Sequence, residues 1–421
     1  MLTKDILTVL SYKIKKMKPS YRYNLKRALK LLSFEKQAHT HSNVLDSFAV
    51  TEEKISHVFN EYSLRTNKTK ANYAFVIPTR ASRFSADYWE EVYEFFPAFR
   101  HMTHEMAYKI LALIPPFKVT SYGEKDSPKG VVIFAPIYED MSKDFRTKLG
   151  LLLKMRNRVS DSVDFARRVY GVKYVGLGAM LPKITNYGKT IRSKVVTTTG
   201  HAGTSWLIAK FVESAMKDIP TKPGKQIVIG FIGGGSIGLA SMQIVSEIYP
   251  DVEIITYDKR EDVNLQNQNI MRAKGVEILI AKNNDELLLK SDIVVSAITS
   301  VLHVYELDLR GKIIIDDSQP GSFIREEVED AGGKLTWVVG RDSSAEKIFS
   351  RNDNYHFGPR GLVSSVDVWG CEAEVGVISY FDRPDLAVSG PVDIRSIKEV
   401  GKLLEEVNIH ESQYQSYGSP Q

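Results

Sequence analysis

The chain has 421 residues, of which 43% are apolar and 25% are charged, so it is not a disordered protein, and its length predicts two or three domains. A single cysteine, Cys371, excludes an intrachain disulfide and any multi-cysteine metal site, which makes a reducing, cytoplasmic compartment the default expectation. No run of residues has the length and apolar character of a signal peptide or a membrane span, so we expect no transmembrane segment.

Positive charge is concentrated at the start of the chain. The formal net charge is +5, but residues 1–40 alone carry ten lysines and arginines against two acidic residues. Such a segment suits an acidic partner protein, anionic lipid or nucleic acid, and a solvated helix face accounts for it equally well. Of these partners we expect no nucleic acid, and we consider an acidic protein that docks at the basic N-terminus.

The first part of the chain is predicted to be helical. Apolar residues recur at helical spacing in residues 25–32, 50–62 and 89–113. We therefore expect an N-terminal helical extension over residues 1–125. A pair of histidines within the last stretch lacks the His-Glu-x-x-His order of zinc hydrolases, so we expect no metal site.

From Gly130 the pattern changes to strands that alternate with helices. Residues 131–134 and 173–177 are typical of buried strands, and residues 142–170 between them have a helical pattern. Strands that are linked by helices form parallel sheets. We therefore expect an α/β domain over residues 126–204, which would bind the substrate.

A second α/β unit opens with a predicted strand at residues 227–232, followed by a glycine-rich turn and a helix. Further short β-rich runs follow at residues 252–257, 277–280, 293–296, 312–315 and 335–338. This is the pattern of a doubly wound parallel sheet, and it predicts a Rossmann NAD(P)-binding domain over residues 205–360. Helices in residues 361–421 are expected to return to the substrate domain. The predicted fold class is α/β, with two α/β domains and an N-terminal helical extension.

The glycine-rich turn matches the dinucleotide-binding fingerprint Gly-x-Gly-x-x-Gly. Its candidate contacts are Gly233, Gly234, Gly235, Ser236, Ile237 and Gly238. In this fingerprint the first glycine makes the tight turn, the second admits the pyrophosphate, and the third lets the helix pack on the strand. The turn also opens a helix whose N-terminal amides can hold an anion, and it precedes Asp258 by 20 residues.

Two other interpretations use the same turn. Gly234-x-Ser236-x-Gly238 also matches the nucleophile elbow of α/β-hydrolases, but a hydrolase leaves Asp258 without a role. The second alternative is a glycine-rich turn that binds no ligand. We favour the dinucleotide, because it accounts for all three glycines and for the acidic residue together.

The candidate cofactor is NADPH or NADH, and the residues around Asp258 leave the choice open. Asp258 would accept hydrogen bonds from the ribose hydroxyls of NADH, whereas Lys259 and Arg260 could hold the 2′-phosphate of NADPH. Ala297 and Thr299 follow a predicted strand and are candidates for contacts near the nicotinamide. A buried strand with a polar turn explains these two residues equally well.

Cys371 follows a glycine at the predicted start of a helix. We expect the helix dipole to lower the pKa of this thiol, with Glu372 and Glu374 opposing the effect. The alternative is a small buried residue with a structural role only. A thiolate beside a nicotinamide suggests attack on a thioester carbonyl, followed by hydride transfer to the acyl-cysteine and release of an aldehyde.

Four local patterns, taken in order along the chain, carry a resemblance to a known family. They are residues 171–178, residues 198–204, the glycine turn with the strand near 291–296, and Gly-Cys-Glu-Ala-Glu at 370–374. With these patterns, residues 136–410 resemble the long-chain acyl-(acyl-carrier-protein) reductases of cyanobacteria, which form aldehydes. The last pattern is similar to the family's Ala-Cys-x-Ala-Glu, whose cysteine accepts the acyl group.

The resemblance implies reduction of an acyl thioester, carried by acyl carrier protein or coenzyme A, to an aldehyde. Cys371 would be the nucleophile, and His201 or Thr204 would donate to the developing oxyanion or protonate it. Asp258 stands where the family has an arginine suited to NADPH, and His201 replaces an asparagine. Residues 317–321 replace a family segment that contains a lysine.

Two functions of other classes use the same features. A two-domain dehydrogenase of a small acid or amino acid, of the shikimate or amino-acid dehydrogenase type, would keep Cys371 as a structural residue. A nonenzymatic dinucleotide-binding protein would keep the glycine turn without catalysis. Replacement of the cysteine separates the first function from these two.

Overall fold

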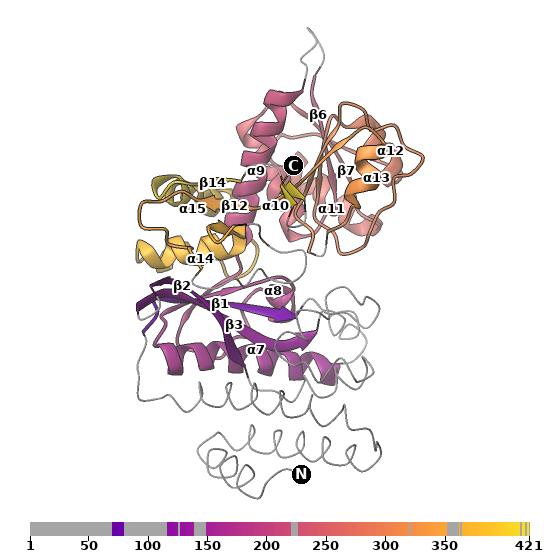
Figure 1. The fold of residues 1–421 in the computed structure, drawn as a ribbon. Coiled ribbons are helices and arrows are strands. Elements are labelled where there is room, and N and C mark those ends of the chain that lie inside the picture. The colour runs from indigo at the N-terminus through magenta and orange to yellow at the C-terminus, as the bar shows by residue number, and fades with distance from the viewer. Residues whose placement is uncertain are drawn as a thin grey trace, which may run out of the picture.

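The computed structural model describes residues 70–79, 116–124, 127–138, 149–219, 226–319, 321–351, 362, 364–412, 415–416 and 419–420. Within these ranges the chain forms two α/β units, each built on its own sheet (Figure 1). The predicted α/β fold class is confirmed. None of the helices in these ranges has the length and apolar character needed to span a membrane.

The first unit is a sheet with the strand order β2-β3-β1-β4-β5. Its strands are β1 (Tyr73–Thr79), β2 (Phe117–Glu124), β3 (Ser127–Tyr138), β4 (Tyr174–Leu177) and β5 (Val196–Thr198). All neighbouring pairs are parallel except β2 and β3. Helix α7 (Leu149–Tyr170) covers one face, and its apolar residues join those of β1 and β3 in one core cluster. A short helix, α8 (Leu181–Ile184), follows β4.

Strands β1 and β2 lie in the part of the chain for which the sequence predicts helices. The expectation of a helical extension over residues 1–125 is therefore wrong at 73–79 and at 117–124. The first of these segments reads YAFVIPT, an apolar run with aromatic and β-branched residues that suits the centre of a parallel sheet. Residues 1–69 and 80–115, which include the basic segment and the histidine pair, lie outside the described residues.

In the second unit, six of the described strands form a parallel sheet with the order β11-β10-β9-β6-β7-β8. The strands are β6 (Val228–Ile232), β7 (Glu253–Tyr257), β8 (Ile278–Ile280), β9 (Ile293–Ser296), β10 (Ile313–Asp316) and β11 (Lys334–Trp337). The helices are α10 (Ser236–Ile248), α11 (Glu261–Arg272), α12 (Asn284–Lys290) and α13 (Arg325–Asp330). This order is that of the doubly wound Rossmann sheet, in which the strand order reverses between β6 and β9.

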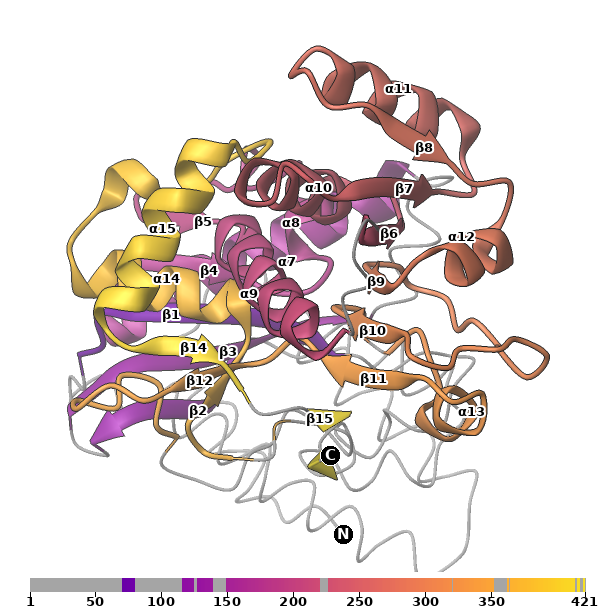
Figure 2. The same cartoon turned by 90° about the horizontal axis from the view of Figure 1, so that it is seen from above.

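Three helices lie between the two sheets and join them. They are α9 (His201–Asp218), α14 (Gly370–Tyr380) and α15 (Ile394–Glu406). Helix α9 packs against α10 of the second unit and against α14 and α15, while α14 packs on β4 and β1 of the first sheet (Figure 2). The close fit depends on small residues: a Cβ at Gly401 of α15 would overlap the ring of Trp206 on α9.

The remaining elements are short. Strands β12 (Gly340–Asp342), β13 (Asp367–Val368) and β14 (Ile409–Glu411) form a small antiparallel sheet beside α9 and α15. A 3-10 turn, η2 (Pro384–Leu386), leads from α14 towards α15, and β15 (Gln415–Ser416) pairs with β16 (Ser419–Pro420). Of these short elements, β14 contacts α9 and α15, and β15 contacts β11 of the second sheet.

Candidate functional site

The glycine turn connects β6 to α10 at the carboxyl edge of the second sheet. Gly233 has a φ of +95°, and its amide donates to the carbonyl oxygen of Tyr257 at 2.9 Å. A Cβ at Gly238 would overlap the carbonyl oxygen of Gly233, so the third glycine allows the helix to start this close to the strand. A Cβ at Gly235, in contrast, would have no heavy atom within 4 Å. The second glycine therefore borders open space.

This arrangement fits the phosphates of a dinucleotide. The turn lies next to β9, at the point where the strand order reverses, and ligands of doubly wound sheets bind there. Helix α10 begins at Ser236, and its N-cap residue, Gly235, has no side chain to cover the first amides. Ala297 lies alongside: its amide donates to the carbonyl oxygen of Ile232, and a Cβ at Gly233 would come within 2.8 Å of its carbonyl oxygen.

Asp258, just beyond the end of β7, is bound by the turn and by its own neighbour. It accepts hydrogen bonds from the Gly234 amide at 2.9 Å and from the Arg260 guanidinium at 2.8 and 2.9 Å. Burial alone would raise the pKa of Asp258, but the hydrogen bonds from Arg260 and Gly234 outweigh burial and hold the pKa below its ordinary value. A ribose diol at Asp258 would share this carboxylate with Arg260, whereas a 2′-phosphate would draw Arg260 away from it.

The other predicted cofactor contacts are less enclosed. Lys259, Thr299 and Gly235 are exposed, and Ser236 and Ile237 are partly buried at the start of α10. Exposed polar residues beside a glycine turn can contact a ligand without any rearrangement of the core. The cofactor contacts of these five residues therefore stay predictions.

Cys371 is the second residue of α14 and lies against the loop that leads into α9. A Cβ at Gly200 would come within 2.5 Å of the Cα of Cys371, and Gly200 itself has a φ of +76°. On the next turn, a Cβ at Gly370 would come within 2.7 Å of the Cα of Thr204. The start of α14 therefore packs closely against the start of α9, with Gly200 near Cys371 and Gly370 near Thr204.

The expectation that the helix dipole lowers the pKa of Cys371 is wrong. Burial raises the pKa of this thiol well above its ordinary value, and the nearby carboxylates of Glu372, Asp317 and Glu374 raise it further. The partial charge at a helix N-terminus is about half an elementary charge, so three acidic groups in a poorly solvated site outweigh it. Cys371 is therefore a protonated thiol at neutral pH and needs a base to become a nucleophile.

His201, the first residue of α9, lies between Cys371's neighbour Gly200 and the glycine turn. Its Nε2 is 3.4 Å from the Oγ of Ser236, and its ring centroid is 5.6 Å from that of Tyr187. Burial lowers the pKa of His201 to about 4, so its imidazole is neutral at pH 7 and can accept a proton. Its Nδ1 is buried and has no hydrogen-bond partner.

Two fully buried glutamates of α14 flank this site. The carboxylate of Glu374 accepts hydrogen bonds from the Gly203 amide at 2.8 Å, from the Gly200 amide at 3.1 Å and from the Thr198 hydroxyl. Glu372 faces the first sheet, where Tyr122 of β2 donates to it. Burial raises the pKa of Glu372 to about 7, although the hydrogen bond from Tyr122 lowers it in part.

Sequence reasoning missed the roles of several of these residues. Asp317 interacts with Cys371 and Tyr187 packs near His201; Tyr187 lies in a loop that no motif marks, and Asp317 belongs to the 317–321 segment, which was noted only for its missing lysine. Glu374 is part of the Gly-Cys-Glu-Ala-Glu pattern, which could have drawn attention to it, but its spacing reveals nothing of its partners. Within the described ranges, no group of three or more His, Cys, Asp or Glu residues could hold a metal ion.

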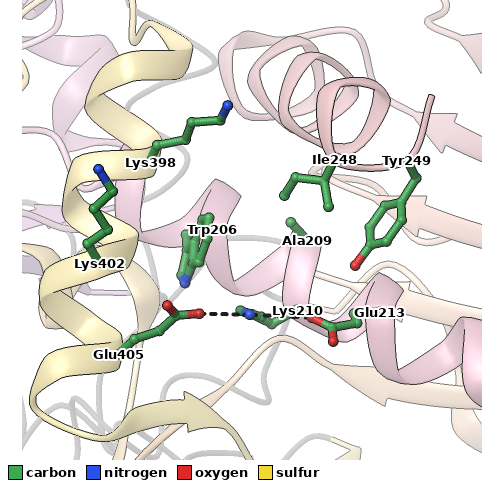
Figure 3. Close-up of a pocket in the computed structure, with 9 residues that line it drawn as sticks. All are labelled: Trp206, Ala209, Lys210, Glu213, Ile248, Tyr249, Lys398, Lys402 and Glu405. Carbon is green, nitrogen blue, oxygen red and sulfur yellow. Dashed lines mark hydrogen bonds and ion pairs between the residues drawn. The ribbon is translucent and has the colours of Figure 1, made fainter.

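A separate cavity of about 330 Å³ lies farther along α9 (Figure 3). Its walls come from α9, α10 and α15, and its lining residues are Trp206, Ala209, Lys210, Glu213, Ile248, Tyr249, Lys398, Lys402 and Glu405. Lys210 forms ion pairs with Glu405 at 2.8 Å and with Glu213 at 3.3 Å. None of the predicted site residues lines this cavity.

Fold and site thus define a two-sheet α/β protein of the Rossmann type, in which the glycine-rich turn lies next to His201. Among solved structures, L-tryptophan dehydrogenase from Nostoc punctiforme is 14% identical; the match covers 81% of this chain and 82% of that one, with a TM-score of 0.35. Thermococcus litoralis Δ1-pyrroline-2-carboxylate reductase, in complex with NADH and L-proline, is 22% identical, with coverages of 27% and 35% and a TM-score of 0.23.

A third such structure is the iminosuccinate reductase of Paracoccus denitrificans in complex with NAD+, at 17% identity, coverages of 28% and 37% and a TM-score of 0.22. The matched part spans only about a third of the length of these two reductases. No protein-family model and no curated protein matches the chain. At these identities and TM-scores, the likeness to dehydrogenases and reductases is distant.

Proposed function

We propose that the protein is an NAD(P)H-dependent oxidoreductase that reduces an acyl thioester to an aldehyde through an acyl-cysteine on Cys371. The observation that carries the proposal is the loop at Gly200 and His201. Gly200 lies against Cys371, and His201 reaches Ser236 in the glycine turn. A nucleophile, a neutral base and a dinucleotide-binding turn are therefore linked by two consecutive residues.

The chain's own residues would carry out the first half of the reaction. The Cys371 thiol passes its proton to the neutral imidazole of His201, and the sulfur attacks the thioester carbonyl. When the tetrahedral intermediate collapses, its bond to the leaving sulfur breaks, and His201 returns the proton to the departing thiol. Thr204 or His201 would donate to the oxyanion during this step.

In the second half, a nicotinamide held at the glycine turn would supply a hydride to the acyl carbon. The hemithioacetal that remains on Cys371 then breaks its carbon–sulfur bond, releases the aldehyde and leaves a thiolate. One proton from solvent restores the thiol, and His201 is placed to pass it on. The reaction consumes one thioester, one reduced dinucleotide and one proton, and it yields one aldehyde, one free thiol and the oxidised dinucleotide.

The thioester donor would be acyl carrier protein or coenzyme A. The basic residues 1–40 suit an acidic carrier protein, because opposite charges on two surfaces speed their encounter. We propose a cytoplasmic location for this reaction, in keeping with the single cysteine and its need for a reducing compartment.

A second candidate is a two-domain dehydrogenase of a small acid or amino acid, in which Cys371 is structural. The raised pKa of Cys371 favours it, since a thiol that stays protonated suits a structural cysteine. His201 would then serve as the base towards the small substrate. The two candidates share the dinucleotide site and differ in what Cys371 does.

The test measures oxidation of NADH and of NADPH with acyl-carrier-protein and acyl-coenzyme A thioesters, for the wild type and for Cys371→Ala. Aldehyde is trapped, and the intact protein is weighed by mass spectrometry to detect an acyl adduct. We expect aldehyde and an adduct in the wild type and neither in the variant. Dinucleotide binding without any acylation of Cys371 would refute the thioester reaction, and turnover of an amino acid by both proteins would establish the second candidate.

A further inference from the structure

We infer that Glu374 is a positioning residue, which holds the loop of residues 198–203 over Cys371 and thereby sets the relation between the thiol, His201 and the glycine turn. The inference rests on the proposed function for its catalytic meaning. Its structural content can be tested separately from turnover. No motif-based role was assigned to Glu374.

The hydrogen bonds of Glu374 all run to one loop. One carboxylate oxygen accepts from the Thr198 hydroxyl and from the Gly200 amide at 3.1 Å, and the other accepts from the Gly203 amide at 2.8 Å. The carboxylate is fully buried, so each lost bond would leave a donor without water to replace it. Glu374 therefore ties strand β5 and the first turn of α9 to the helix that carries Cys371.

The held loop also lies against Cys371, which is partly buried. Gly200 lies so close to Cys371 that a side chain at Gly200 would overlap it. The backbone of Gly200 is also in the left-handed conformation, which side chains rarely adopt. Gly203 lies equally close to the carbonyl oxygen of Gly370 on the other side of the nucleophile. If the loop lifts, access to the thiol increases, and His201 moves with the loop.

Glu372 provides a matched control on the same helix. It is as deeply buried as Glu374 and stands next to Cys371 in the chain, but its hydrogen bond runs to Tyr122 of the first sheet. Both glutamates raise the pKa of the thiol, together with Asp317, and His201, which follows Gly200 in the held loop, is a neutral group because burial lowers its pKa to about 4. Substitution of either glutamate changes the charge near the sulfur, and only substitution of Glu374 frees the loop.

Alkylation of the single cysteine separates these two effects. The rates with a small reagent, iodoacetamide, and with a bulky one, N-phenylmaleimide, are measured at one pH for the wild type, Glu374→Gln and Glu372→Gln. The thiolate fraction affects both reagents alike, so the ratio of the bulky to the small rate reports access alone. We expect the ratio to rise on the order of tenfold in Glu374→Gln and to stay unchanged in Glu372→Gln.

Two results would overturn the inference. One is an unchanged ratio in Glu374→Gln, and the other is an equal rise in both variants. If Glu374→Gln does not fold, Thr198→Val removes a single donor and keeps the carboxylate. We then expect a smaller rise in the same direction, and no rise in a folded Thr198→Val protein refutes the positioning role.

Turnover distinguishes failure of this inference from failure of the proposed function. In an active enzyme, Glu374→Gln lowers kcat on the order of tenfold and changes the KM for the dinucleotide less than about twofold, because the glycine turn is untouched. Glu374→Asp, which keeps the charge, restores part of kcat. If the wild type never acylates Cys371, the proposed function is refuted. The alkylation ratio then still tests whether Glu374 holds the loop. An active wild type with an unchanged ratio and kcat in Glu374→Gln refutes the positioning role alone.

Discussion

Glu372→Gln is expected to change how the stability of the protein depends on pH. The Glu372 carboxyl is fully buried, and its pKa of about 7 lies well above the ordinary value of 4.5. Between these two values the folded protein keeps a proton that the unfolded chain releases. The stability that this group contributes is therefore fully present below pH 4.5 and is lost as the pH rises through 7.

The size of the effect follows from the two pKa values. Each pH unit between them contributes about 1.4 kcal/mol, so the wild type loses about 3 kcal/mol from this group between pH 4.5 and 7. Glutamine has nearly the same shape and can still accept the hydrogen bond from Tyr122, but it does not titrate. We expect Glu372→Gln to gain about 3 kcal/mol relative to the wild type across this range.

Urea unfolding followed by fluorescence at half-unit steps from pH 5 to 8 measures the effect. His201→Gln serves as the opposite control, because burial lowers the pKa of His201 to about 4, and its contribution is lost as the pH falls from 6.5 through 4. The two variants should therefore tilt the stability curve in opposite directions. Parallel curves for Glu372→Gln and the wild type would show that Glu372 is ionised in the fold at neutral pH and refute the reasoning.

Three further outcomes test the dinucleotide site and its role. Gly238→Ala should destabilise the protein by about 3 kcal/mol, because its Cβ would overlap the Gly233 carbonyl, as measured by urea unfolding. Gly235→Ala should fold normally, since its Cβ meets open space, and should lose on the order of tenfold in dinucleotide affinity by fluorescence titration; normal affinity would contradict a pyrophosphate at this glycine. Arg260→Ala, which frees Asp258, should shift the ratio of NADH to NADPH affinity on the order of tenfold towards NADH, and a shift towards NADPH would contradict the competition between the two ligands.

The sequence predicts the Rossmann sheet well because each of its strands is a short apolar run bounded by glycine or polar residues. The predicted strands at 227–232, 252–257 and 293–296 lie within a residue of those observed. Strand β1 was missed, since a seven-residue, mostly apolar run surrounded by helical patterns gives no local sign of the parallel neighbours that stabilise it. Neighbours in a parallel sheet are distant in sequence.

The sequence predicted which residues belong to the candidate site, but it did not predict how the fold shifts their pKa values. The residues near Cys371 in the chain suggested a lowered thiol pKa, whereas the fold adds burial and the carboxylate of Asp317 from a loop 54 positions away. The partner of Glu372 is 250 residues distant, and no spacing rule connects such a pair. Local patterns identify which residues can react, and the tertiary structure determines their protonation.

The junction between the sheets has a thermodynamic consequence. The largest core cluster includes Tyr73 and Phe75 of the first sheet, Ile229 and Ile313 of the second, and Phe211 of α9 between them. Apolar contacts that run without a break from one sheet to the other couple their unfolding. Although the chain has two sheets, the described parts should melt cooperatively, in one calorimetric transition whose measured enthalpy equals the van't Hoff enthalpy. Two separated transitions would mean that α9 belongs to one sheet alone.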